Sequence, residues 1–335
     1  MREPQAEPDA HESGGGGRRE AFGKEDRCQL SGPTRRCYHP PRDRRLTLVD
    51  AHHHFWDPAT NPYPWLSPTP LPTLRYGDYA ALRRRYLPQD YARDTAGWVI
   101  AGTVHVEAEW DRADPVAETR WLAEVRRRHG WPTVAVAHAA LEGDGVDAVL
   151  AAHAAFDFVR GIRQKPEPGQ MSDARWRRGY ARLARHGLSY DLQAPFERRA
   201  EAAGLARDFP DTRIVVNHTG LPVDHGEDGL KAWRRALETV AAQPSVALKV
   251  SGLGGPDQSW PVEANRRVVR DAIAIFGVAR CLFASNYPVD SLCASFDAIF
   301  RAFDGFTADL PEADRRALFS DNARRIYRMD EAPPG

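Results

Sequence analysis

Short apolar runs alternate with amphipathic segments along most of the chain, from about residue 46 to the end. The runs are rich in β-branched residues and are bounded by polar residues, which is typical of strands. Several are apolar almost throughout, as expected of parallel strands that are covered on both faces. Eight strands are predicted in this way, at residues 47–54, 99–108, 133–141, 158–164, 188–193, 213–218, 246–253 and 281–285.

The segments between these runs carry one-sided apolar stripes at helical spacing. The clearest stripes lie in residues 176–183, 230–240 and 292–303. Their aromatic residues are predicted to pack in the core rather than to contact a cofactor. Helices are predicted to begin near Asp173 and Pro261, because Asp is a frequent N-cap and Pro is frequent in the first turn.

Strand and helix alternate eight times in about 290 residues, which is the pattern of a (β/α)8 TIM barrel. A doubly wound open sheet shares the alternation and is the alternative. The count of eight and the absence of a glycine-rich dinucleotide-binding sequence after the first strand favour the barrel. The predicted fold class is therefore α/β, with catalytic groups at the C-terminal ends of the barrel strands.

Residues 1–45 differ in composition from the rest of the chain. They are rich in Gly, Arg, Glu and Pro, and contain little that can be buried. Such a segment cannot offset its conformational entropy, so a disordered N-terminal tail is predicted. The catalytic domain is predicted to span residues 46–330.

Charge and composition exclude several partners. The formal net charge is zero, from 46 basic and 46 acidic residues, so neither nucleic acid nor an anionic membrane is indicated as a partner. No apolar run approaches the ~20 residues that span a membrane. The four cysteines form no CxxC pair and fit a reducing compartment. These features favour a cytoplasmic protein with a small-molecule substrate, and they leave its oligomeric state open.

Polar residues stand at nearly every predicted strand end. His52 and His54 are two residues apart on the first strand, so their side chains point to the same face. Two imidazoles on one face can bind a divalent cation, for which zinc is the usual candidate. The alternative is a surface or packed histidine cluster. His218, at the end of the sixth strand, can complete a group of three.

Other polar residues near the strand ends have two interpretations each. Arg163 is either a structural ion-pair partner or a clamp for a carboxylate. Lys249 lies inside an apolar run, where burial is costly without a partner or a task. Asp191 either bonds the backbone or assists the site. Trp65, in a long loop after the first strand, either stacks on a substrate or packs over the barrel rim.

Several short motifs, taken in order, resemble a known family. The chain is similar to the amidohydrolase-related family over about residues 46–328, in the branch of the sugar lactonases and 2-pyrone-4,6-dicarboxylate lactonase. This resemblance independently implies a distorted TIM barrel. The motifs that carry it are Asp50-Ala51-His52-His53-His54-Phe55-Trp56-Asp57, Tyr63-Pro64-Trp65-Leu66, Gly161-Ile162-Arg163, Asn217-His218-Thr219-Gly220, Leu248-Lys249-Val250-Ser251-Gly252-Leu253 and Phe283-Ala284-Ser285-Asn286-Tyr287-Pro288-Val289.

The resemblance implies roles for particular residues. His52, His54 and His218 would hold a divalent metal or bind a lactone carbonyl directly. Arg163 would contact the substrate. In the family, an Asp at the end of the eighth strand is the general base that activates water.

The chain departs from the family at that base, where it has Asn286. A neutral amide cannot take a proton from water near neutral pH, although it can orient a reactant. Asp290, four residues later, either replaces the base or caps the next helix. Glu107 is another candidate for base, metal ligand or substrate contact. Tyr287 is assigned to substrate binding, as are Arg163, Trp65 and Lys249.

The expected function is a hydrolase that opens a lactone by attack of activated water on the carbonyl. A divalent metal, zinc first, is the expected cofactor, with metal-independent catalysis as the alternative. Two other functions stay open: a metal-dependent decarboxylase or C–C hydrolase of the same superfamily, and a non-catalytic barrel that has lost its base.

Overall fold

The predicted strands form one parallel sheet in a computed structural model of the chain, which describes residues 46–67, 75–222 and 224–330. The described residues all belong to one compact unit, residues 45–335. The tail predicted for residues 1–45 lies outside them. The strands in the described part are β1 (Thr47–His53), β2 (Val99–Val106), β3 (Val134–Ala137), β4 (Val159–Arg163), β5 (Ser189–Leu192), β6 (Ile214–Val216), β7 (Val246–Val250) and β8 (Cys281–Phe283).

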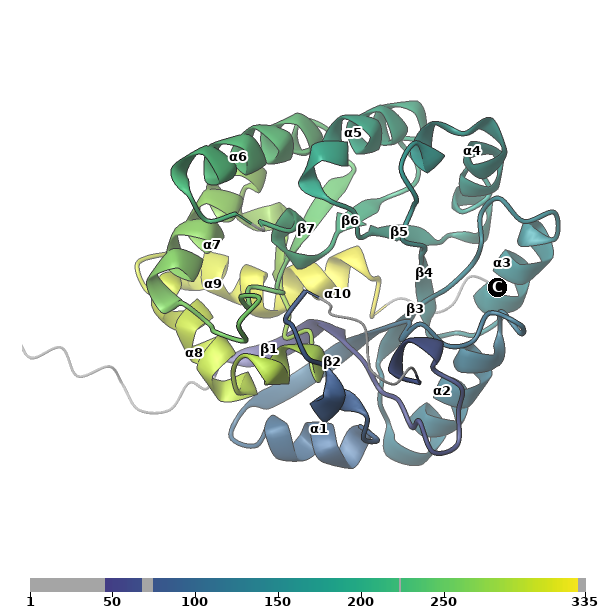
Figure 1. Ribbon diagram of the computed structural model, residues 1–335, viewed down its shortest axis with the longest axis horizontal. Coiled ribbons are helices and arrows are strands. Elements are labelled where there is room, and N and C mark those ends of the chain that lie inside the picture. Colours follow the sequence, from purple (N-terminus) through teal and green to yellow (C-terminus); the bar gives the residue numbers. More distant parts are fainter. Residues whose placement is uncertain (1–45, 68–74, 223, 331–335) are drawn as a thin grey trace, which may run out of the picture. The chain divides into compact units, whose positions relative to one another are not determined.

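Each strand pairs in parallel with the next, from β1 to β8. The sheet closes where β1 meets the segment after β8. There the backbone N–H of His54 donates to the Tyr287 carbonyl over 2.7 Å. Asp50 accepts hydrogen bonds from the Ser285 N–H and hydroxyl over 2.8 and 2.6 Å. The fold is therefore the predicted (β/α)8 barrel, and helices surround the strands (Figure 1).

The helices follow the strands in alternation and pack on the outside of the barrel. Their apolar stripes face inward, as predicted: Trp176, Trp233 and Phe300 are fully buried. Asp173 caps α4 by accepting from the Trp176 N–H over 2.8 Å. The helices are α1 (Pro88–Asp94), α2 (Ala117–His129), α3 (Val146–Ala154), α4 (Ala174–Tyr180), α5 (Arg199–Asp208), α6 (Glu227–Ala241), α7 (Val262–Phe276), α8 (Phe296–Phe306), α9 (Glu312–Arg316) and α10 (Asn322–Ile326).

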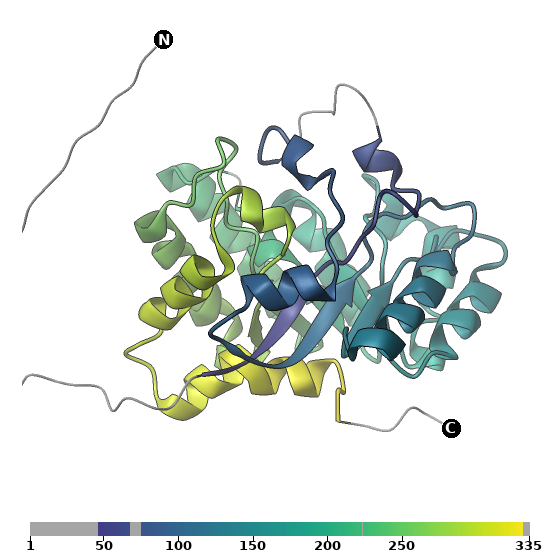
Figure 2. The ribbon, with the colours of Figure 1, turned by 90° about the horizontal axis from the view of Figure 1, so that it is seen from below.

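Small apolar side chains fill the interior of the barrel, and the C-terminal segment closes one end. Ile326 and Tyr327 pack against interior residues such as Val49 and Leu282. Figure 2 shows α10 at one end of the barrel and the segment that follows β1 at the other. The end left for a ligand is therefore the one at which the strands finish. None of the helices described is long and apolar enough to cross a membrane.

Candidate functional site

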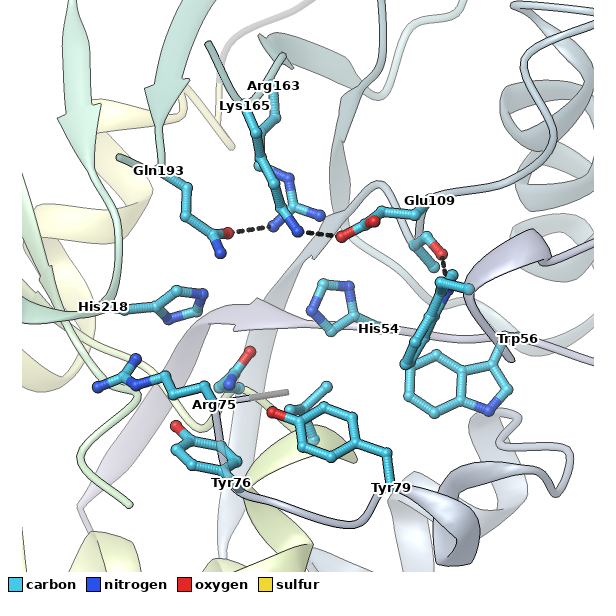
Figure 3. A pocket seen from close by; sticks show the side chains of 14 residues that line it. His54, Trp56, Arg75, Tyr76, Tyr79, Glu109, Arg163, Lys165, Gln193 and His218 are labelled. Atoms are coloured by element: carbon cyan, nitrogen blue, oxygen red, sulfur yellow. Dashed lines mark hydrogen bonds and ion pairs between the residues drawn. The ribbon is translucent and has the colours of Figure 1, made fainter. Parts of the chain in front are cut away.

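A cavity of about 230 Å³ opens at the C-terminal ends of the strands. Figure 3 shows His54 and His218 between two groups of side chains. One group contains Arg163, Lys165, Glu109 and Gln193, and the other contains Arg75, Tyr76 and Tyr79. The lining residues are His54, Trp56, Trp65, Arg75, Tyr76, Tyr79, Ala108, Glu109, Arg163, Lys165, Gln193, His218, Asn286 and Val289.

The three histidines singled out by the sequence lie together: His54 and His218 line the cavity, and His52 is buried beside them without lining it. The ring centre of His52 is 5.0 Å from that of His54 and 4.5 Å from that of His218. All three are buried. Burial is the main cause that holds the pKa of each imidazole well below its usual range, so the rings are neutral at neutral pH.

The tautomer of His54 follows from its hydrogen bond. Its Nδ1 lies 2.7 Å from the Val106 carbonyl oxygen, which can only accept. Nδ1 therefore carries the hydrogen, and Nε2 presents a lone pair. A neutral ring in this tautomer can bind a cation or accept a hydrogen bond, but it cannot donate to a substrate carbonyl.

His218 stands on a turn of unusual backbone conformation. Four consecutive residues, His218 to Leu221, have φ between 52° and 70°. For residues other than Gly this region costs about 1–3 kcal/mol each and is kept only where the surroundings enforce it. Here the Thr219 hydroxyl donates to the Ser251 carbonyl over 2.9 Å, and the Trp233 indole donates to the Thr219 carbonyl over 2.9 Å. The turn is thus held firmly, as is typical of functional sites.

Arg163 faces the cavity and is oriented by Glu107. Its Nε donates to Glu107 Oε1 over 2.7 Å, and its NH1 donates to Gln193 Oε1 over 3.1 Å. Glu107 also accepts from Arg112 over 2.9 Å. Although burial opposes it, the charges of Arg163 and Arg112 hold the pKa of Glu107 well below its usual range. Glu107 does not line the cavity and is paired with both arginines, so the structure gives no support to its assignment as a substrate contact or base.

Lys249 is also outside the cavity. Its Nζ donates to Asp191 Oδ2 over 2.6 Å, and both side chains are fully buried inside the barrel. The Tyr327 hydroxyl donates to the same carboxylate over 3.0 Å. The sequence assigned Lys249 to substrate binding, but the structure uses it in a structural ion pair. Asp191, which had two interpretations, is its partner.

Tyr287 and Trp65 were both assigned to substrate binding, but only Trp65 lines the cavity. The Tyr287 hydroxyl donates to the Ala294 carbonyl over 2.7 Å, and its ring packs on Phe296, away from the cavity. Tyr287 does not line the cavity, so the structure gives no support to its assignment to substrate binding. Trp65 lines the cavity, and its indole N–H donates to the Ala108 carbonyl over 2.8 Å.

Asn286 and Asp290 form a pair beside the cavity. Asn286 lines it, and its Nδ2 donates to Asp290 Oδ1 over 2.6 Å. Asp290 does not cap α8, because Ser295 has that role. Burial is the largest cause that raises the pKa of Asp290 to about 6, against the lowering effect of its hydrogen bonds. Asp290 is thus a buried acid able to exchange a proton near neutral pH.

The sequence reasoning missed three residues on the loop after β1: Arg75, Tyr76 and Tyr79. The Tyr76 hydroxyl donates to Asp290 Oδ1 over 2.9 Å, and Arg75 donates to the Gly252 carbonyl. The loop has neither strand nor helix periodicity, so no pattern marked these positions. The only available signal was the length of the loop itself, which is typical of a substrate-covering segment.

The family resemblance implies a metal, and the donors present fit one. His52 is buried with both ring nitrogens lacking a hydrogen-bond partner, which is costly without a ligand. His54 presents the Nε2 lone pair that a metal requires. Even so, within residues 46–67, 75–222 and 224–330, no three His, Cys, Asp or Glu side chains converge as they stand on one ion position.

Comparison with known proteins supports this assignment of the fold. The uncharacterized protein y4mH of Sinorhizobium fredii is 41% identical over 296 residues, 85% of this chain and 99% of that protein. An L-fucono-1,5-lactonase of Burkholderia ambifaria is 29% identical over 300 residues, 84% of this chain and 96% of the enzyme. A crystal structure of an amidohydrolase from Burkholderia multivorans with bound zinc has a TM-score of 0.71 and 26% identity, over 84% of this chain and 99% of that one. Residues 49–329 match the family model described as Amidohydrolase, and the chain therefore belongs to that family.

Proposed function

We propose that the protein hydrolyses a lactone. The observation that carries the proposal is the placement of neutral imidazoles and cationic side chains in one cavity with Asp290, a buried acid of pKa about 6, behind its wall. Ester hydrolysis needs both parts, a group that stabilises negative charge on the carbonyl oxygen and a base for water. The L-fucono-1,5-lactonase relative supports the same reaction class.

The cavity wall suits a ring that carries polar substituents. Trp56 and Trp65 meet edge to face, with ring centres 5.5 Å apart, and offer an apolar surface. Arg163 presents a guanidinium to the cavity from β4. Arg75 brings a second guanidinium from the loop, and the described residues give it no carboxylate partner. These two cations can bind hydroxyl, carboxylate or carbonyl oxygens of the substrate.

His52, His54 and His218 are the residues that would hold a divalent metal, zinc first. When bound, such an ion polarises the carbonyl of an ester. The protein itself contributes the orientation of the ring by Trp56 and Trp65, the binding of oxygen atoms by Arg163, and the acceptance of a proton from water by Asp290.

A panel of lactones tests this proposal by proton release in weakly buffered indicator solution. The panel contains sugar 1,4- and 1,5-lactones and lactones with a free carboxylate, each with and without added zinc or manganese. We expect turnover of at least one class, and a loss of 100-fold or more in Asp290→Asn, the usual size of a general-base contribution. A purified wild-type protein that hydrolyses no member of the panel would overturn the proposal.

Two other assays on the same samples separate the alternatives. Carbon dioxide release from hydroxybenzoates, without proton release from lactones, would identify a decarboxylase. Ligand-dependent shifts in thermal unfolding without any turnover would identify a binding protein that has kept the barrel.

A further inference from the structure

Asp290 is not in direct contact with the cavity, and this raises the question of how it receives a proton. Its side chain is buried, and it does not line the cavity. Two residues that do line the cavity, Tyr76 and Asn286, both donate to Asp290 Oδ1, over 2.9 and 2.6 Å. Among the described cavity-lining side chains, these two hydrogen bond to Asp290, so they can link it to a bound reactant.

The two side chains differ in what they can do. An ionised carboxylate only accepts hydrogen bonds, so the Asn286 amide must turn its NH2 to Asp290 and its carbonyl oxygen away from it. An amide cannot pass on a proton, whereas a hydroxyl donates one hydrogen bond and accepts another. The Tyr76 hydroxyl donates to Asp290 and keeps a lone pair for a water molecule in the cavity.

We propose that Tyr76 is a catalytic residue that relays a proton from the attacking water to Asp290, while the Asn286 carbonyl oxygen orients that water. The proposal rests on the proposed lactone hydrolysis and names the path of its proton. It also gives a reason for the neutral Asn286. In this chain the base is Asp290, which does not line the cavity and is hydrogen bonded to Asn286, the residue at the position of the family's Asp.

Water gives one proton to the Tyr76 oxygen as Tyr76 gives its own proton to Asp290 Oδ1. The water oxygen bonds to the carbonyl carbon, and the C=O π pair moves to the carbonyl oxygen. The C=O bond then reforms as the ring C–O bond breaks, and the proton returns from Asp290 through Tyr76 to the leaving alkoxide. Burial, followed by the charge of Asp290, raises the pKa of Tyr76 well above its usual range, so the two transfers occur together and no phenolate forms.

Few other charged groups face Asp290. Arg75 is the nearby cation, and its charge favours the ionised carboxylate. Tyr79 and Cys293 are the other titratable neighbours, and burial raises both pKa values to about 12. Neither changes charge near pH 6. Burial also raises the pKa of Asp50, which accepts from Ser285, to about 6, so a transition at that pH is assigned to Asp290 by its loss in Asp290→Asn.

The test compares Tyr76→Phe with Tyr180→Phe. Tyr180 is a matched control, because it is similarly buried, is the last residue of α4, does not line the cavity and has a hydroxyl without a hydrogen-bond partner. We expect kcat on the best lactone to fall 100-fold or more in Tyr76→Phe with KM changed less than threefold, and to stay within twofold in Tyr180→Phe. The acid limb of the kcat profile, expected near pH 6 in the wild type, should move to higher pH, because the variant loses a hydrogen bond that favours the charged Asp290.

A second measurement does not depend on turnover. Carbon-13 NMR of labelled aspartate carboxyls gives the pKa of Asp290 directly, and we expect it to rise in Tyr76→Phe and to stay unchanged in Tyr180→Phe. An unchanged kcat or an unchanged Asp290 titration in Tyr76→Phe would overturn the relay while lactone hydrolysis by the wild type stands. A wild type without lactone turnover would overturn the proposed function, and the relay as a step in it, whatever the titration.

Discussion

Gly252 lies directly against the ring of His218. A Cβ at position 252 would come within 2.8–2.9 Å of three His218 atoms, closer than real Cβ contacts, and the backbone there has φ +64°. Gly252→Ala therefore forces His218 to move. We expect a loss of at least tenfold in kcat/KM, because displacement of a catalytic group by about 1 Å has effects of this size or larger.

The control for this variant is Gly187→Ala. Gly187 has the same φ, +64°, but no atom lies within 4 Å of its hypothetical Cβ. Both variants carry the backbone penalty of about 1–2 kcal/mol for a left-handed residue. Equal activity loss in both, measured at a temperature at which both are folded, would show that strain rather than His218 displacement is responsible.

Asn286→Asp tests whether the amide is a lost base. The new carboxylate would stand 2.6 Å from Asp290 Oδ1. Two carboxylates at this distance share one proton, and the pair ionises fully only at higher pH. We expect a lower kcat at pH 7 and an acid limb moved upward by more than one pH unit.

The exchanged variant, Asn286→Asp with Asp290→Asn, restores one charge and one amide. It should be more active than the single variant, because no proton is trapped between two carboxylates. A higher kcat in Asn286→Asp alone, with an unmoved pH profile, would show instead that the family's direct base is sufficient and that Asp290 contributes little.

Asp290 also makes stability depend on pH. Its pKa in the folded protein, about 6, is above the ordinary 3.8, so the folded state binds the proton more tightly than the unfolded state. The stabilisation from binding this proton is fully present below pH 4 and is lost as pH rises through 6. The loss lowers the free energy of unfolding by about 3 kcal/mol. Asp290→Asn removes this dependence. In urea titrations, the free energy of unfolding of Asp290→Asn relative to the wild type should therefore increase by up to about 3 kcal/mol between pH 4 and pH 8. The variant should be inactive. A constant difference across this range would contradict the pKa.

Most of the barrel could be predicted from the sequence because its signals are local. Apolar runs mark β1 to β8, and one-sided stripes such as that of α6 mark the helices. Asp290, for which the sequence left a base and a helix cap as alternatives, shows the limit of such signals. Asp290-Ser291 has the composition of a helix start, yet Ser295 is the residue that caps α8. Asp290 instead accepts a hydrogen bond from Tyr76, a residue distant in sequence.

The site could be predicted only where the strands position it. His52, His54 and His218 follow from strand periodicity and strand ends. The ion pair of Lys249 could not be predicted, because the sequence does not reveal that its partner is Asp191, two strands away. Tyr76 was missed because its position depends on how an irregular loop folds over the barrel.

Lys249 and Asp191 provide a separate prediction on stability. Lys249→Met would leave the Asp191 carboxylate buried without its cation, which typically costs 3–5 kcal/mol. The double variant Lys249→Met/Asp191→Asn removes both charges and should lose less stability than Lys249→Met in urea unfolding. KM should stay within twofold in the folded double variant, because neither residue lines the cavity. A large rise in KM with little loss of stability in the double variant would show instead that Lys249 contributes to substrate binding.

The metal proposal can be tested with His52→Asn, using His53→Asn as its control. Both histidines are fully buried on β1 with unpartnered ring nitrogens, but His53 contacts Phe55 and Tyr91 rather than His54 and His218. We expect about one zinc per chain in the wild type and in His53→Asn, and less than a tenth of that in His52→Asn, by elemental analysis. Because a ligand that binds only the folded state stabilises it, a chelator should lower the midpoint of thermal unfolding of the first two proteins and not of the third. Lactone turnover that persists in metal-free wild type, with an unchanged midpoint, would show that hydrolysis does not require an ion.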